Sequence, residues 1–428
     1  MTAPTRLKAR FLGARIEAKA KSPLGRLIVL TGARQTGKTT LVQRTFPGIP
    51  YLSMEDPAVR PAFSRLSARD WIERYPVAII DEVQKAPSIV ESIKAAYDAS
   101  ESVRYLLLGS SQILLLSRIR ESLAGRVAIE ELWPLTLPEM ATSSWSDPLA
   151  PSRLVNWLDG GAGDTLSLLG VPALDGAFAK HAEAFETYLR YGGMPAVWKG
   201  DLPAEDRDSW LRDYRRTYLE RDVADLASLR DLEPFVVAQK AIALSTGRLV
   251  NFNDLARAVS ISPATARRFL RYLELSYQAV LVPPYFRNPH KRLTKMPKVH
   301  ILDPGVLRGI TGRTGEPSGE EFESAVVAEI FKQCRTAGLR ADFLHLRTHV
   351  GREVDLLVET EKGFIAFEIK QSRHVADADA RGLRGLEEIL DRPLLGSFLL
   401  SMDPEVRPLA GGVLAMPAAW ALSPPSAA

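Results

Sequence analysis

The sequence predicts an α/β protein that begins with a parallel sheet and crossover helices, continues through a helical region, and ends in a second, mixed α/β part. Residues 24–140 alternate β-rich runs with helical stretches, which is typical of parallel strands joined by helices. Residues 181–312 are mainly helical, and residues 313–428 return to mixed α/β patterns. The expected strands of the first part are Leu27–Thr31, Tyr51–Met54, Val77–Asp81, Arg104–Gly109 and Val127–Leu132.

Length and composition exclude several classes of protein. A chain of 428 residues suggests about two to four domains, and 46% hydrophobic with 25% charged residues is ordinary globular composition. Cys334 is the only cysteine, so no disulfide can form within the chain. No run approaches the ~20 apolar residues of a membrane span, and the first 23 residues lack the continuous apolar core of a signal peptide. A cytoplasmic location is therefore expected.

Composition shifts along the chain predict five segments. Residues 1–141 are expected to form the first α/β domain, and residues 142–182, rich in Ser, Pro, Gly and Asp, a linker or surface insertion. Residues 183–235 are expected to be a helical connector. A small helical domain with two terminal strands, residues 236–312, and a mixed α/β domain, residues 313–428, follow.

A glycine-rich loop follows the first strand and precedes a helix. It fits the pattern G-x-x-x-x-G-K-[ST], in which backbone N–H groups and the helix N-terminus face phosphates. Lys38 is expected to reach the β and γ phosphates of ATP, and the Thr39 hydroxyl to ligate Mg²⁺. A chance match is the alternative, which the strand–loop–helix context disfavours. The expected nucleotide-binding residues are Gly32, Ala33, Arg34, Gln35, Thr36, Gly37, Lys38, Thr39 and Thr40.

Two acidic residues end the strand that begins at Val77. Asp81 emerges at the carboxyl edge of the sheet, where it is expected to hold the Mg²⁺ shell. Glu82 is placed to polarise a water for attack on the γ phosphate. The extra strand 51–54, between the loop and Asp81 in sequence, and the adjacent Glu82 favour the ATP-hydrolysing branch of phosphate-loop proteins. The alternative is a solvated Asp–Glu pair that caps the next helix.

Two further residues are candidates for a role near the γ phosphate. Ser110 follows the strand 104–109 and is expected to be a polar sensor, or otherwise a helix N-cap. Arg126 offers a cation that would stabilise transferring charge, either in its own chain or in a neighbouring copy. An ordinary surface role for Arg126 is the alternative.

These motifs resemble the AAA-type ATPases of the archaeal-ATPase-like group. The family usually has proline after the first loop glycine, whereas this chain has Ala33; that residue contributes backbone, so the expected chemistry is unchanged. The resemblance implies ATP and Mg²⁺ as ligands and a P-loop fold. It is carried by Gly32–Thr40, Ile80–Gln84, Leu108–Ser111, Ser122–Arg126 and Leu135–Glu139.

The middle of the chain is strongly basic. Asn253–Ser260 and Ser262–Ser276 are expected to form a helix–turn–helix, and two strands joined by a basic loop would form a wing. Between Arg248 and Lys298 there are ten Lys/Arg and two acidic residues, a local charge of 10 − 2 = +8 against +4 for the whole chain. Such a concentration of positive charge indicates binding to the phosphate backbone of a nucleic acid. The alternative is a protein-docking or dimerisation module.

Three arginines of the second helix are the candidate DNA contacts. They lie within about one turn of each other, opposite its apolar side. They are Arg267, Arg268 and Arg271.

A second acidic constellation lies near the C-terminus. Two β-rich runs, 351–358 and 363–370, are separated by a short connection and are expected to pair as a hairpin. Alternation places Glu368 and Lys370 on one face, beside Asp355 of the partner strand. Two carboxylates there would hold Mg²⁺ and a lysine would orient the attacking water, with Glu323 of an upstream helix as a further acid. The alternative is a solvated hairpin.

This spacing resembles the PD-(D/E)XK nuclease superfamily. The match consists of Asp355, Glu368-x-Lys370 and Glu323 as the helix acid. It implies a restriction-endonuclease-like domain in which Glu323, Asp355 and Glu368 bind metal while Asp355, Glu368 and Lys370 take part in catalysis. The segment from Tyr188 to about Lys370 also resembles a domain of unknown function that is commonly fused to these ATPases.

The expected function is Mg²⁺-dependent ATP hydrolysis coupled to a winged-helix and nuclease-like module that acts on DNA. The alternative is a nucleotide-switched regulatory or scaffold protein whose C-terminal module binds a protein partner and cuts nothing. The sequence leaves open whether copies of the chain associate, and it gives no reason to expect a membrane.

Overall fold

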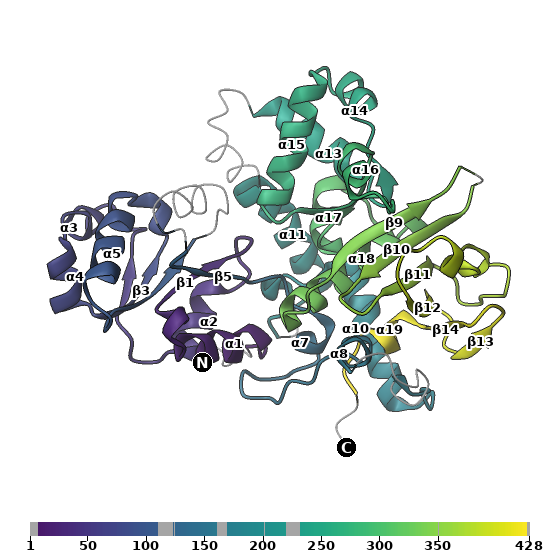
Figure 1. The fold of residues 1–428 in the computed structure, drawn as a ribbon, viewed down its shortest axis with the longest axis horizontal. Coiled ribbons are helices and arrows are strands. Elements are labelled where there is room, and N and C mark those ends of the chain that lie inside the picture. Colours follow the sequence, from purple (N-terminus) through teal and green to yellow (C-terminus); the bar gives the residue numbers. More distant parts are fainter. Residues whose placement is uncertain are drawn as a thin grey trace.

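The computed structural model describes residues 7–109, 123, 125–160, 169–200, 202–219, 232–349 and 351–425. Figure 1 shows an N-terminal α/β domain on one side and a C-terminal sheet on the other. Helices α13 (Glu233–Leu244) to α15 (Pro263–Leu275) lie above them, and α18 (Gly319–Ala337) lies near the centre. Among the described residues, none of the helices has both the length and the apolar character needed to cross a membrane.

The described part of the N-terminal domain holds a parallel five-stranded sheet. Its order is β2-β3-β4-β1-β5, and every neighbouring pair is parallel, which confirms the sheet predicted from the sequence. In the sheet, β4 separates β1 from the Asp81 strand, and β2 lies at the edge. The strands are β1 Leu27–Thr31, β2 Tyr51–Ser53, β3 Val77–Asp81, β4 Arg104–Leu108 and β5 Ala128–Glu131. The helices are α1 Phe11–Ala20, α2 Lys38–Thr45, α3 Arg60–Ser64, α4 Ala68–Arg74, α5 Ser88–Ala99 and α7 Leu137–Met140.

The middle of the chain contains the helix pair and the hairpin predicted from the sequence. Ser262 caps α15 through the Thr265 N–H, and Pro263 occupies the first turn, as predicted. The described residues form a three-stranded antiparallel sheet in the order β6-β8-β7. The helices are α10 Gly176–Tyr191, α11 Ala204–Tyr214, α13 Glu233–Leu244, α14 Phe252–Ala258, α15 Pro263–Leu275, α16 Pro289–Thr294 and α17 Pro304–Thr311. The strands are β6 Arg248–Leu249, β7 Ala279–Val282 and β8 Lys298–Ile301.

The C-terminal part is a mixed sheet covered on one face by the long helix α18, Gly319–Ala337. In the described ranges its order is β13-β14-β12-β11-β10-β9. Strands β9, β10 and β11 form an antiparallel meander, so the predicted hairpin is confirmed, and β12 and β14 continue parallel to β11. The strands are β9 Asp342–Arg347, β10 Glu353–Glu359, β11 Phe364–Lys370, β12 Leu394–Ser401, β13 Arg407–Leu409 and β14 Val413–Pro417, and the sheet is followed by α19 Ala418–Ala421.

Within the segment 142–182, the described residues 153–159 differ from the linker or surface insertion that the composition predicts. Helix α8, Arg153–Asp159, is buried on its apolar side against the C-terminal sheet. The ring of Trp157 packs edge-on against Phe398 at 5.0 Å between centroids. Burial of such an indole removes a large apolar area from water, so this segment stabilises the C-terminal core.

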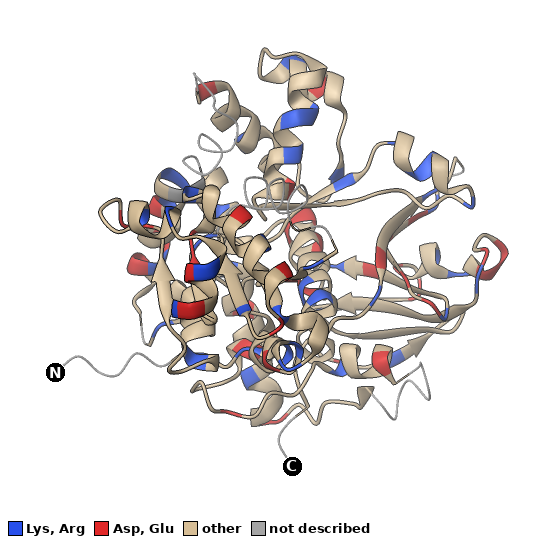
Figure 2. Ribbon diagram, turned by 60° about the vertical axis from the view of Figure 1, so that its left-hand side comes forward, with Lys and Arg blue, Asp and Glu red and all other residues tan. Residues whose placement is uncertain are grey.

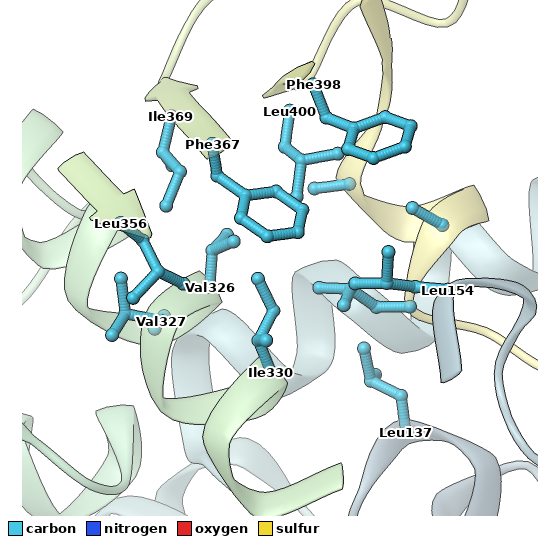
Figure 3. Close-up of a cluster of buried hydrophobic side chains, with 14 of the residues drawn as sticks. Leu137, Leu154, Val326, Val327, Ile330, Leu356, Phe367, Ile369, Phe398 and Leu400 are labelled. Atoms are coloured by element: carbon cyan, nitrogen blue, oxygen red, sulfur yellow. The ribbon is translucent and has the colours of Figure 1, made fainter. Parts of the chain in front are cut away.

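The largest apolar cluster lies between α18 and the C-terminal sheet. Figure 3 shows Val326, Val327 and Ile330 of α18 facing side chains of β10, β11 and β12. Leu137 and Leu154 belong to the same cluster and lie at its edge in this view. Leu137 belongs to the segment that leaves the N-terminal sheet, so this segment packs into the C-terminal core, while the N-terminal sheet has apolar clusters of its own.

A fully buried ion pair on α18 holds that exit segment. The Lys332 ammonium lies 2.7 Å from the Glu329 carboxylate, and neither side chain is exposed. Lys332 donates to the Leu135 carbonyl at 3.2 Å, and Glu329 accepts the Leu137 N–H at 2.7 Å. Because a buried ion pair is tolerated only when its remaining polar atoms are bonded, these backbone contacts fix the segment on α18.

We predict that Lys332→Met destabilises the protein by about 3–5 kcal/mol, because Glu329 would be left buried without its counter-charge. The measurement is chemical or thermal unfolding followed by circular dichroism. Adding Glu329→Gln should restore much of the loss, since Gln keeps an acceptor for the Leu137 N–H. Arg69→Met, which removes an exposed pair with Glu73, is the control and should change little. Equal stability of Lys332→Met and the wild type would contradict the prediction.

Candidate functional site

The predicted phosphate loop connects β1 to α2 in a conformation that depends on its two glycines. Gly32 has φ +146°, and a Cβ there would lie 2.2 Å from the Leu132 carbonyl oxygen, so no larger residue fits. Gly37 has φ +91° and is the N-cap of α2. The backbone wraps tightly and turns directly into the helix, which is the arrangement that directs N–H groups toward an anion.

Side chains of α2 and β3 form the polar contacts at the loop. The Lys38 ammonium donates to the carbonyls of Gly32 and Ala33, both at 2.8 Å. The Thr39 hydroxyl donates to Asp81 Oδ2 at 2.7 Å, which brings α2 and β3 together. A hydroxyl and a carboxylate this close are the hard oxygen ligands that Mg²⁺ prefers, so these residues fit such an ion.

Tyr51 is a member of this site that the sequence analysis missed. Its hydroxyl donates to the same Asp81 oxygen as Thr39, at 2.5 Å. Burial, followed by the Asp81 carboxylate, raises the pKa of Tyr51 above its ordinary value, so the phenol stays a donor. Tyr51 lies on β2 and Asp81 on β3, and only the pairing of these strands places the two side chains together.

Glu82 adopts a left-handed backbone, with φ +53°. For a non-glycine residue this conformation costs about 1–3 kcal/mol, and such strain is concentrated at functional sites. Its N–H is bonded to Asp81 Oδ1 at 2.8 Å, and its carboxylate accepts from the Gln84 amide. Glu82 lines the cavity beside Asp81.

The loop opens onto a cavity of about 1010 Å³, a volume suited to a ligand of nucleotide size. One wall consists of residues 34–41 together with Asp81 and Glu82. The opposite wall includes Lys8 and Arg10 and residues of the 195–199 turn, which belongs to the connector. The cavity is therefore bounded by two parts of the chain that are far apart in sequence.

Of the other two candidates near the γ phosphate, only Arg126 belongs to the described residues. Ser110 lies outside the described residues. Arg126 forms a bidentate pair with Asp98, with distances of 2.8 and 3.1 Å, and it is not among the residues that line the cavity. The structure therefore does not place Arg126 for a role in its own chain, and a role in a neighbouring copy stays a prediction.

Two tyrosines from the middle of the chain contact the phosphate loop and its strand. The Tyr214 hydroxyl donates to the Arg34 carbonyl at 3.0 Å. The hydroxyls of Tyr277 and Thr31, the last residue of β1, share a hydrogen bond of 2.7 Å, and Tyr277 also donates to Glu131 at 3.2 Å. Sequence reasoning missed both, because nothing local to either tyrosine indicates a partner about 180 or 246 residues away.

The structure also brings together the acids predicted near the C-terminus. Asp355 of β10 accepts the Ile369 N–H of β11 at 2.8 Å, and Lys370 lies 2.7 Å from Glu368. Glu323 of α18 faces the same cluster. Glu368 Oε2 is buried without a hydrogen-bond partner. Burial, followed by the charge of Asp355, raises the pKa of Glu323 to about 8 and that of Glu368 to about 7.

Lys298 of β8 lies in the middle of this acidic cluster. Its ammonium is 3.0 Å from Glu323, 2.9 Å from Glu353 and 3.5 Å from Asp355, and its side chain is only 4% exposed. Burial alone would lower the pKa of Lys298, but the three carboxylates outweigh that effect and raise the pKa above that of an exposed lysine.

The predicted metal site at Glu323, Asp355 and Glu368 does not fit a divalent ion in this arrangement. Mg²⁺ would require carboxylate oxygens at about 2.0–2.1 Å. One oxygen of Glu323 and one of Asp355 already face an ammonium, and the other Asp355 oxygen accepts the Ile369 N–H. Among the described residues, no group of three His, Cys, Asp or Glu side chains has a geometry that could hold a metal. The physical reason is a positive charge from another part of the chain, which the local motif cannot reveal.

The three candidate arginines of α15 are exposed. Arg267 stacks over the Phe252 ring at 4.6 Å, and Arg271 lies 3.3 Å from Glu274. Figure 2 shows blue bands along the helices at the top, the height of α14 and α15 in Figure 1. The opposite side of α15 is buried through Ala266 and three larger residues, Phe269, Leu270 and Leu273.

Comparisons with known proteins match the chain in three consecutive parts. Residues 25–141 match an AAA domain, residues 182–316 a domain of unknown function (DUF8612), and residues 318–420 another domain of unknown function (DUF4143). With the parallel sheet and the phosphate loop, the first match identifies the N-terminal part as an AAA-like P-loop ATPase domain.

Relatives of the whole chain carry no assigned role in their names. Uncharacterized proteins of Mycobacterium bovis and Mycobacterium tuberculosis are each 27% identical over 407 residues, covering 92% of this chain and 80% of theirs. Among solved structures, a Walker-type ATPase of Pyrococcus abyssi is 15% identical with a TM-score of 0.45, covering 71% of this chain and 98% of its own.

We predict that two substitutions separate nucleotide binding from turnover. Lys38→Ala should abolish ATP binding, because the ammonium that reaches the phosphates is lost. Glu82→Gln should bind ATP like the wild type yet hydrolyse it at least about 10²-fold more slowly, since an amide cannot take a proton from water. Calorimetry with ATP and Mg²⁺, together with phosphate release, measures both. Lys21→Ala on the exposed side of the domain is the control. Unchanged hydrolysis by Glu82→Gln would show that another group activates the water.

Proposed function

We propose that the chain hydrolyses ATP with Mg²⁺ at its phosphate loop and uses the nucleotide state to reposition a DNA-binding middle segment and the C-terminal sheet. The observation that carries the proposal is the cavity at the loop, whose second wall comes from the connector. A nucleotide between these walls would contact both, so its γ phosphate would bias their relative position.

At the phosphate loop each residue has a distinct task. Lys38 would leave the loop carbonyls for the phosphates, and the loop N–H groups would hold the triphosphate. Thr39 and Asp81 would hold Mg²⁺, which neutralises charge on the phosphate oxygens when bound. Glu82 would accept a proton from the attacking water, and Tyr51 would keep Asp81 oriented.

The contacts of Tyr214 and Tyr277 support coupling between the ATPase domain and the middle segment. Both hydroxyls bond to the loop or to the strand that precedes it. Tyr277 also packs edge-on against Trp133 at 5.1 Å between ring centroids, so its position follows the end of the N-terminal sheet. A shift of the phosphate loop would therefore reach β7, which begins two residues after Tyr277.

The arrangement of α13 to α15 with the β7–β8 hairpin supports interpreting residues 233–301 as a winged helix. Its exposed arginines and the local charge of +8 favour DNA as its ligand. The alternative is a nucleotide-switched scaffold whose middle segment docks a protein partner. In that case the chain would show no measurable DNA binding and therefore no salt-dependent affinity.

We predict that replacing Arg267, Arg268 and Arg271 together by Ala weakens DNA binding and lowers its salt dependence. Each lost phosphate contact should reduce the slope of log K against log [salt] by about one. Fluorescence anisotropy with duplex DNA at several salt concentrations measures the slope. A triple variant at Arg69, Arg340 and Arg373, which are exposed elsewhere, is the control. A wild-type slope in the α15 variant would place the DNA contact on another surface.

We also predict that Tyr277→Phe reduces stimulation of the ATPase by DNA while leaving the basal rate unchanged. The lost hydroxyl removes bonds to Thr31 and Glu131, worth about 1 kcal/mol, or roughly fivefold in coupling. Phosphate release with and without DNA measures the effect. Tyr285→Phe is the matched control, because that hydroxyl bonds to Asp391 and not to the ATPase sheet. Equal loss in both variants would argue against a specific path through Tyr277.

A further inference from the structure

A cation from outside the C-terminal sheet forms ion pairs with the acidic cluster of that sheet. Lys298 reaches it from β8, which belongs to the middle segment. Three carboxylates from two different elements surround the ammonium, those of Glu323 on α18 and of Glu353 and Asp355 on β10. The ion pairs of Lys298 therefore link the middle segment to α18 and to the C-terminal sheet.

Lys298 is held firmly in this position. It lies on β8, the central strand of its sheet, and it pairs in register with Leu249 of β6 and Val282 of β7. Its side chain is 4% exposed. Because the backbone is paired on both sides and the side chain is almost fully covered, the ammonium cannot move far without opening the contact between β8 and α18.

The ammonium competes directly with any divalent ion. Lys298 faces one oxygen of Glu323 and one of Asp355, and the other Asp355 oxygen accepts the Ile369 N–H. A metal on these carboxylates would lie beside the ammonium, and two cations so close together would repel each other. The lysine that the nuclease resemblance assigns to the water, Lys370, is a separate residue, 41% exposed and paired with Glu368. The chain thus has one lysine more at this cluster than the resemblance accounts for.

We propose that Lys298 is the resident cation of the cluster formed by Glu323, Glu353, Asp355 and Glu368, and that it excludes divalent metal ions from it. The cluster then holds the middle segment against the C-terminal sheet, and the C-terminal module does not cut DNA. This inference goes beyond the proposed ATPase and DNA-binding roles, which do not depend on it.

The test is a titration of the full chain with Mn²⁺ in the absence of nucleotide, followed by electron paramagnetic resonance. The wild type and Asp355→Asn should bind equal amounts of Mn²⁺, because the cluster takes none. Lys298→Met should gain one Mn²⁺ per chain, and Lys298→Met with Asp355→Asn should lose it again. Lys370→Met, at the exposed edge of the cluster, is the control and should gain nothing.

Two results would overturn the proposal: Mn²⁺ binding by the wild type that Asp355→Asn abolishes, or a folded Lys298→Met that gains no ion. Should Lys298→Met fail to fold, the comparison of the wild type with Asp355→Asn still decides. Supercoiled DNA with Mg²⁺ or Mn²⁺ gives an independent measurement, in which Asp355-dependent nicking would also contradict the proposal. ATP hydrolysis and DNA binding by the same samples show separately whether the proposed function holds.

Discussion

The buried pair of Glu329 and Lys332 determines how the ATPase sheet lies against the C-terminal sheet. Two charges without any exposure are stable only because each also bonds to the backbone of the segment that leaves the ATPase domain, at Leu137 and Leu135. The same segment is bonded to the connector, since the Leu135 N–H donates to the Gly193 carbonyl at 2.7 Å. Three parts of the chain therefore meet at one short stretch of backbone, whose Leu135 and Leu137 side chains also pack into the apolar core around α18.

This junction explains why the nucleotide cavity has a wall from the connector. Gly193 lies two residues before the turn at 195–199. A Cβ at Gly193 would lie 2.3 Å from the Leu135 carbonyl oxygen, so the two backbones can approach only because this residue is glycine. The Gly193 N–H also donates to Asp303 at 2.6 Å, at the start of α17. The close contact with the Leu135 backbone would thus resist movement of the turn by a bound nucleotide. The hydrogen bond to Asp303 would transmit such movement to the middle segment.

Features that depend on local sequence could be predicted, and features that depend on distant pairing could not. The phosphate loop, Asp81 and Glu82, the cap at Ser262 and the C-terminal hairpin all follow from residues a few positions apart. Tyr51, Tyr277 and Lys298 each join the sites only because strands or helices far apart in sequence pack together. The apolar residues of α8 could have indicated burial, but the flanking Ser, Pro and Gly residues outweighed them in composition.

The β7–β8 hairpin places the two sites of the molecule at opposite ends of one short element. Tyr277 lies just before β7 at the end where Ala279 pairs with Ile301, and Lys298 lies at the other end, opposite Val282. A strand of four residues spans only about 13 Å, so a tilt of the hairpin that follows the ATPase strand would also change the depth at which the Lys298 ammonium sits among its carboxylates. Since those charges are buried, withdrawing the ammonium would be costly, and the acidic cluster would oppose large movements of the middle segment. The energy of ATP binding at the phosphate loop would have to exceed that resistance before the hairpin could move.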